Sequence, residues 1–113
     1  MIERFEPVFD RLRHMMLVAA PTMVVTKDWP GSLELRTAET DPKTNERGWF
    51  GTVTIKKTYV AVHLMPLYTK PDLAADCSAE LGKRRQGKTC FNFTRIDDRL
   101  FDELADLMRR CVA

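Results

Sequence analysis

The first part of the chain has the apolar spacing of an amphipathic helix. Its apolar residues recur every three or four positions, at Phe5, Phe9, Leu12 and Met16. Charged residues take most of the remaining positions, so one side of such a helix would face a core. Proline is tolerated in the first turn of a helix and cannot continue one. The pattern therefore predicts a helix from about residue 4 to about residue 18, with Pro7 in its first turn and Pro21 beyond its end.

From Met23 onward the spacing of apolar residues shortens to the two-residue alternation of β-strands. Residues 23–27 and 33–37 are β-branched or alternating. Pro30 and Gly31 lie between them and suit the two central positions of a type II turn. We expect a hairpin here, followed by a mobile polar loop over residues 38–47.

A second pair of strands is predicted over residues 49–55 and 58–65, joined at Lys56-Lys57. In the latter strand one face is uniformly apolar, with Val60, Val62 and Leu64. The opposite face is mixed, with Tyr59, Ala61, His63 and Met65. We expect the apolar face to pack on the core and the mixed face to line a groove or meet a partner.

The last third of the chain predicts two helices with a short strand between them. Prolines end the preceding strand, and residues 72–81 suit a short helix with Asp72 or Pro71 near its start and Gly82 as its C-terminal cap. Residues 90–94 alternate like a strand. Asp97 or Asp98 would then cap a final helix, whose apolar stripe is Leu100, Leu104, Leu107, Met108 and Cys111.

Together these elements predict an α+β fold with the order α-β-β-β-β-α-β-α. A single antiparallel sheet of about five strands would be packed by the N- and C-terminal helices. At 113 residues the chain fits one domain, spanning residues 1–113. No internal repeat and no low-complexity tract interrupts it.

Composition and charge narrow the function classes. The chain has 44% hydrophobic and 30% charged residues and a net charge of only +2, which indicates a compact globule and implies no partner for the whole surface. No apolar run approaches the ~20 residues that cross a bilayer, so we expect no membrane contact and a cytoplasmic location. The three cysteines are widely spaced, which argues against a disulfide framework or a zinc site and predicts reduced thiols. We predict no cofactor.

Residues 81–93, LGKRRQGKTCFNF, combine four cations with two glycines and an alternating aromatic run. From Gly82 to Thr89 the letters fit the phosphate-binding P-loop pattern G-x-x-x-x-G-K-T. A P-loop follows a buried strand and opens a helix, whereas here a helix is predicted before the pattern and a strand after it. The context therefore argues against a nucleotide site and favours a basic turn. Burial of Phe91 and Phe93 in a core is also simpler than nucleic-acid stacking.

The basic turn and the mixed face of the strand at residues 58–65 carry our leading candidate site. We expect a groove between the sheet and the turn that binds a small anionic ligand, lined by His63, Tyr68, Arg84, Arg85, Lys88 and Asn92. An enzyme using His63 as acid or base is an alternative, although no nucleophile can be named from the sequence. The sequence otherwise names no catalytic residue. A homodimer is a further option, and nucleic acid is disfavoured as a partner.

Residues 62–68, the run 81–93 and the following Ile96-Asp97-Asp98 resemble the YdhG-like family of small uncharacterised bacterial proteins. The shared features are an H-L-M-x-x-Y strand end and a Q-G-K-[ST]-C-F-N-F run before an acidic-capped last helix. The resemblance implies a frataxin-like α+β fold and no assigned reaction. Some relatives with this fold are described as iron chaperones, which would make an acidic side of the first helix a metal site, formed by Glu3, Glu6 and Asp10. The arginines among these acids weaken that alternative.

Overall fold

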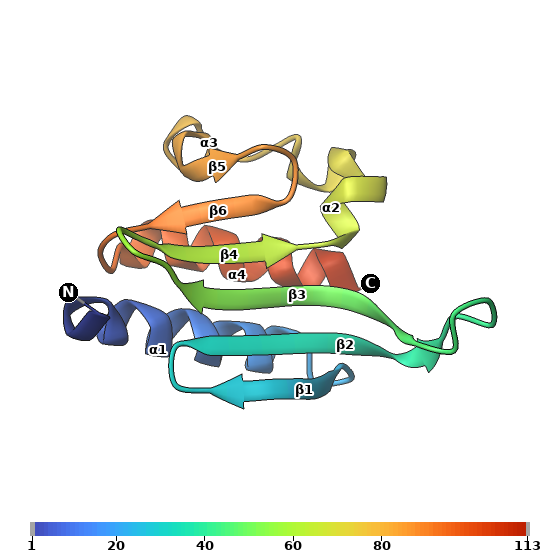
Figure 1. Ribbon diagram of the computed structural model, residues 1–113. Helices are drawn as coiled ribbons and strands as arrows, with labels where there is room; N and C mark the ends of the chain where they lie inside the picture. The colour runs from blue at the N-terminus through green and yellow to red at the C-terminus, as the bar shows by residue number, and fades with distance from the viewer. Residues whose placement is uncertain (1, 113) are drawn as a thin grey trace.

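The fold consists of a six-stranded antiparallel sheet with two long helices on one face, as seen in a computed structural model that describes the backbone of residues 2–112 and the side chains of residues 4–112 (Figure 1). The strands lie in the order β1-β2-β3-β4-β6-β5. Along the chain the elements are α1 (Ile2–Ala19), β1 (Val24–Trp29), β2 (Ser32–Thr40), β3 (Arg47–Ile55), β4 (Val60–Leu64), α2 (Pro66–Thr69), the 3-10 helix η1 (Pro71–Ala74), α3 (Ala79–Arg84), β5 (Arg85–Gln86), β6 (Cys90–Phe93) and α4 (Asp98–Val112). The predicted α+β class, with terminal helices packed on an antiparallel sheet, is confirmed.

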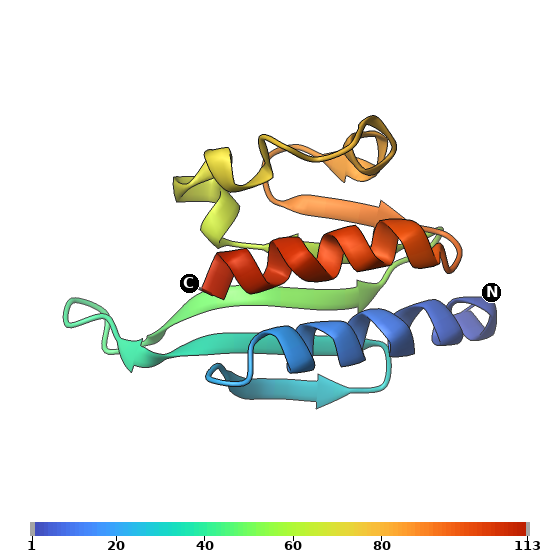
Figure 2. The same ribbon diagram turned by 180° about the vertical axis from the view of Figure 1, so that it is seen from behind.

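The core lies between the sheet and the two long helices. Figure 2 shows α1 and α4 side by side across one face of the sheet, and Figure 1 shows that neither of these two helices covers the other face. The predicted stripes of both helices are buried, as are the apolar alternate positions of the central strands. Phe93 of β6 meets Phe101 of α4 edge to face, with ring centroids 5.1 Å apart, a favoured aromatic geometry. This packing sets which side chains of each strand remain on the open face.

The predicted hairpin and the loop after it are both present. Gly31, between β1 and β2, has φ +77°, which suits the third position of a type II turn and is strained for any residue with a Cβ. The strand β2 continues to Thr40, so the polar loop is shorter than expected and covers residues 41–46. The helix α1 starts at Ile2, which places Pro7 beyond the first turn predicted for it.

A bulge in β3 re-aims the side chains at one end of the sheet. Leu35 of β2 pairs with Gly51, and the next residue, Arg36, pairs with Trp49, so Phe50 is the extra residue. Phe50 and Gly51 both turn toward the core, and Trp49 reaches the open face. The bulge thus places the Trp49 ring on the open face of the sheet, which α1 and α4 do not cover.

The helix predicted at 72–81 is wrong in its bounds. The segment forms η1 and, after a break, α3, whose N-cap is Ser78. The Ser78 hydroxyl accepts a hydrogen bond from the Leu81 amide, and Glu103 of α4 accepts from both the Ser78 amide and its hydroxyl at 2.6 Å. Gly82 therefore lies inside α3 and is not its cap. The sequence suggested Asp72 as a start because the tertiary contact to Glu103 cannot be seen from local pattern.

The context of the P-loop-like pattern is as predicted, because the pattern begins inside the helix α3 and the strand β6 follows it. Gly87 has φ +70° and lies in the tight turn between β5 and β6. The two-residue strand β5 was not anticipated and makes the sheet six-stranded. In the part of the chain that the structure describes, no helix is long and apolar enough to cross a membrane.

Candidate functional site

The open face of the sheet carries the mixed side chains of the central strands. In β4 and β6 the buried residues alternate with partly exposed ones. Ala61 pairs with Asn92 and His63 with Cys90, so these four side chains form two cross-strand pairs on one face. Thr52 of β3 lies opposite His63 on the other side. His63 is consequently at the centre of a three-strand surface formed by β3, β4 and β6.

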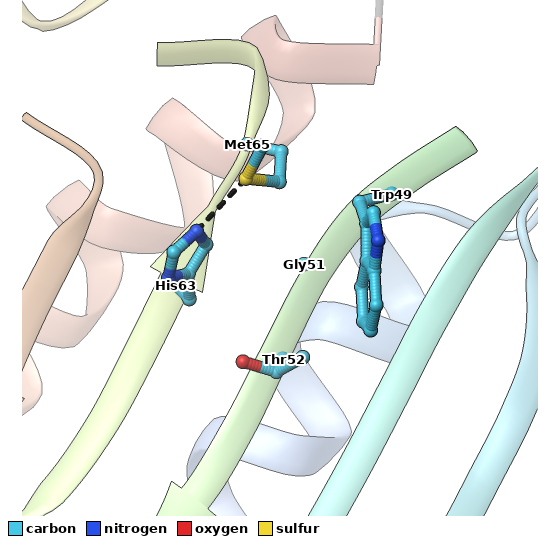
Figure 3. A pocket seen from close by; sticks show the side chains of 5 residues that line it. All are labelled: Trp49, Gly51, Thr52, His63 and Met65. Atoms are coloured by element: carbon cyan, nitrogen blue, oxygen red, sulfur yellow. Dashed lines mark hydrogen bonds between the residues drawn. The ribbon is translucent and has the colours of Figure 1, made fainter. Parts of the chain in front are cut away.

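Two adjoining hollows meet at His63 and Thr52. The first has a volume of about 260 Å³ and is lined by Trp49, Gly51, Thr52, His63 and Met65 (Figure 3). The second has a volume of about 240 Å³ and runs along the sheet in the other direction. It is lined by Thr52, Thr54, Lys56, Tyr59, Ala61, His63, Gln86, Cys90 and Asn92. We call the two together the open-face groove.

The two ends of the open-face groove differ in chemistry. Trp49 and Met65 form an apolar end, with the indole standing across from His63 in Figure 3. Arg36 stacks on the Trp49 ring at 3.6 Å from the centroid and donates to Glu34 at 3.1 Å, which fixes one side of the indole. The other end carries amides, hydroxyls and Lys56. No carboxylate is found among the described residues that line the groove.

His63 lies between two sulfur atoms. Its Nδ1 is 3.2 Å from Cys90 Sγ, and its Nε2 is 2.9 Å from Met65 Sδ. Burial lowers the pKa of the imidazole below its ordinary value, because the charged form would be poorly solvated there. The ring is therefore neutral at neutral pH and has one donor and one acceptor nitrogen.

The six residues predicted to share a groove are divided among different places. His63 and Asn92 line the open-face groove. Lys88 lies over the ring of the exposed Tyr68 with its Nζ 5.7 Å from the centroid, and Arg85 donates to the Lys88 carbonyl. Arg84 lines a separate hollow with Arg95 and Asp97. The cations of the basic turn do not line the groove, and Gln86 is the residue that this turn contributes to it.

The acidic side of α1 shows no gathered ligand set. The side chain of Glu3 lies outside the described residues. Glu6 and Asp10 are exposed and line a hollow with Phe9 and Pro30. Within residues 4–112 no three side chains of histidine, cysteine, aspartate or glutamate come together as metal ligands would.

Sequence reasoning missed Cys90, Trp49 and Thr52 as groove residues. Alternation gave a usable signal for Cys90, since Phe91 and Phe93 were predicted to be buried and Cys90 must then point the other way. The pairing of Cys90 with His63 depends on the β4–β6 register, which alternation leaves open. Trp49 could not be placed because the bulge in β3 reverses the expected alternation.

Comparison with known proteins adds no assignment to this geometry. No family model matches the chain, and neither the curated proteins nor the solved structures contain a significant match.

Proposed function

We propose that the protein binds a small neutral or anionic molecule with a planar apolar part in the open-face groove. The observation that carries this is the pair of hollows joined at His63 and Thr52, one end apolar and the other polar. Their volumes together fall in the range of about 300–1,000 Å³ typical of small-molecule sites. An apolar wall with a few convergent polar groups is the usual composition of such sites.

The lining residues support both parts of the ligand description. Trp49 and Met65 offer a flat ring and a deformable thioether to an apolar surface. Lys56 adds a positive charge, and Asn92 and Gln86 add amide donors, while the described lining residues carry no negative charge. A cationic ligand would find no counter-charge there, so neutral or anionic chemistry is favoured.

The fluorescent anion anilinonaphthalene sulfonate tests this function, because it joins two flat apolar ring systems to a sulfonate. Binding is followed by energy transfer from tryptophan in a Trp29→Phe background, which leaves Trp49 as the donor. Replacing Trp49 by leucine removes the donor, so for that variant the probe's own fluorescence is titrated. We expect Trp49→Leu to weaken binding about threefold to tenfold, the value of an aromatic contact.

A matched pair of lysines tests the charge. Lys56 lines the groove, whereas its neighbour Lys57 is exposed and does not. Lys56→Gln should weaken binding of the anion by up to about fivefold, and Lys57→Gln should leave it unchanged. Equal affinity in the parent, Trp49→Leu and Lys56→Gln would show that the probe does not use this groove and would reject the proposed function.

The YdhG-like resemblance remains a prediction, and the proposed ligand site rests on none of the properties it implies. We do not extend the proposal to iron. The only described acids of that alternative, Glu6 and Asp10, lie exposed on a helix whose Arg11 and Arg13 pair with carboxylates elsewhere, on Asp98 and Asp28.

A further inference from the structure

The two sulfur contacts of His63 determine which of its nitrogens carries the proton. The Met65 thioether has no hydrogen to donate, so its contact at 2.9 Å with Nε2 requires an N–H on that nitrogen. In the neutral ring Nδ1 is then the lone-pair acceptor. It lies 3.2 Å from Cys90 Sγ, and the thiol is the only group of that pair with a proton to give. The Cys90 S–H therefore donates to His63 Nδ1.

This arrangement matches the requirements for an activated thiol. A nucleophile within hydrogen-bond reach of a base, with the base held by a third group, is the general pattern of nucleophilic activation. Here Cys90 is the nucleophile, His63 the base and Met65 the group that holds the ring. The Thr89 hydroxyl lies 3.8 Å from Cys90 Sγ. The reactive sulfur lines the groove, so it is open to a small molecule.

The other two thiols lack these features. Cys111 is buried on α4, where desolvation raises the pKa of its thiol to about 11. Burial, followed by the charge of Glu103, raises the pKa of the Cys77 thiol as well. Because the thiolate is the attacking species in thiol chemistry, both are held in the unreactive form.

We propose that Cys90 exchanges with low-molecular-weight disulfides, with His63 as the general base, and is thereby converted reversibly to a mixed disulfide. The thiol proton passes to His63 Nδ1 as Sγ attacks one sulfur of the disulfide. A new S–S bond forms, the original S–S bond breaks, and the departing thiolate takes the proton from the imidazolium. Cys90 is oxidised, half of the small disulfide is reduced to a thiol, and His63 returns to its neutral state.

The reaction does not depend on the ligand proposed above, so its test uses a probe with neither a ring nor a charge. The reduced full-length protein is mixed with hydroxyethyl disulfide at neutral pH, and the mass gain is followed with time and located by peptide mapping. We expect Cys90 to be the first residue modified and Cys90→Ser to abolish the fast phase. Modification of Cys77 or Cys111 at the same rate as Cys90 would overturn the inference.

The role of His63 is tested with matched histidine variants. His63→Gln removes the base, and His14→Gln makes the same change on an exposed turn of α1, the helix on the opposite face of the sheet. General-base assistance predicts that His63→Gln slows the fast phase by about tenfold or more, while His14→Gln leaves it unchanged. An unchanged rate in folded His63→Gln would overturn the inference.

A second variant covers the case in which His63→Gln does not fold, which circular dichroism would show. Met65→Leu keeps an apolar side chain of similar size and removes the acceptor that holds the proton on Nε2. The ring can then place its proton on Nδ1 instead, so the rate at Cys90 should fall severalfold while the fold is retained. A rate equal to that of the parent would show that the tautomer does not control the thiol and would overturn the inference.

Discussion

Replacement of glycine by alanine should have opposite effects on stability at Gly51 and at Gly82. A Cβ at Gly51 would lie 2.6 Å from the carbonyl oxygen of His63 and 3.0 Å from Met16 Cε. The carbonyl belongs to the neighbouring strand β4, so it can yield only if the two strands separate. Inserting a methyl group into a packed core costs about 1–3 kcal/mol, and Gly51→Ala should cost an amount in the upper half of that range because the obstructing atom is backbone.

Gly82 is the control, because a Cβ there meets nothing within 4 Å. It lies inside α3, and its φ is not in the positive range that favours glycine. Alanine is favoured over glycine in such a position by about 0.5–1 kcal/mol, so Gly82→Ala should stabilise the protein. If Gly82 were the helix cap predicted from the sequence, Gly82→Ala would instead destabilise the protein, because a cap residue in the left-handed conformation disfavours alanine.

Urea unfolding monitored by far-ultraviolet circular dichroism measures both changes. The free energies of unfolding of the two variants should differ by about 2.5–4 kcal/mol. For a chain of this size 1 kcal/mol corresponds to about 4 °C in the melting temperature, so the melting temperatures should differ by about 10–16 °C. If Gly51→Ala unfolds at the same urea concentration as the parent, the close approach of β3 and β4 is wrong. If Gly82→Ala is destabilised, Gly82 is a cap after all.

Three further predictions follow from single contacts. Burial lowers the pKa of His63, so below the ordinary value of 6.5 the unfolded chain binds a proton that the folded chain does not bind. The free energy of unfolding should therefore fall as the pH drops below that value, and His63→Gln should flatten this part of a stability profile measured by urea unfolding. An equal slope in both proteins would contradict it. Ser78→Ala removes the hydroxyl that caps α3 and donates to Glu103, while the backbone amide keeps its bond to Glu103, and should cost about 1–2 kcal/mol in urea unfolding. Glu103→Gln, which keeps an acceptor, should cost less, and the reverse order would be inconsistent with the cap. Cys111 is buried and the pKa of its thiol is raised to about 11. Its rate of alkylation by iodoacetamide should therefore follow the fraction of protein that is unfolded in urea. Rapid alkylation of the native protein would contradict this and show that the C-terminal end of α4 opens locally.

Local chemistry was sufficient to predict most of the fold. Apolar spacing located both long helices, and Asp97 accepts a hydrogen bond from the Leu100 amide at 3.2 Å as a predicted cap should. The Pro30-Gly31 turn followed from glycine's access to positive φ. These features succeed because each depends on residues only a few positions apart.

The failures involve contacts between distant residues. The start of α3 at Ser78 depends on Glu103, which lies 25 positions away. Likewise, the cations of the basic turn were expected in the groove because they are conspicuous in sequence. The short strand β5 instead places Gln86 beside Cys90, and Arg85 is held by the Lys88 carbonyl within the turn.

The His63–Cys90 pair shows how core packing fixes chemistry on the opposite face. Alternation alone is equally consistent with a register shifted by two residues, which keeps every apolar side chain on the same face of the sheet and places Cys90 opposite Ala61 in place of His63. The observed register sets Val62 against Phe91 and Val60 against Phe93. Phe93 also meets Phe101 edge to face, and a shift of β6 by two residues, close to 7 Å at the usual strand rise, would break that contact. Aromatic packing beneath the sheet therefore selects the register that brings the thiol to the imidazole, and the reactivity of Cys90 depends on residues that never touch the groove.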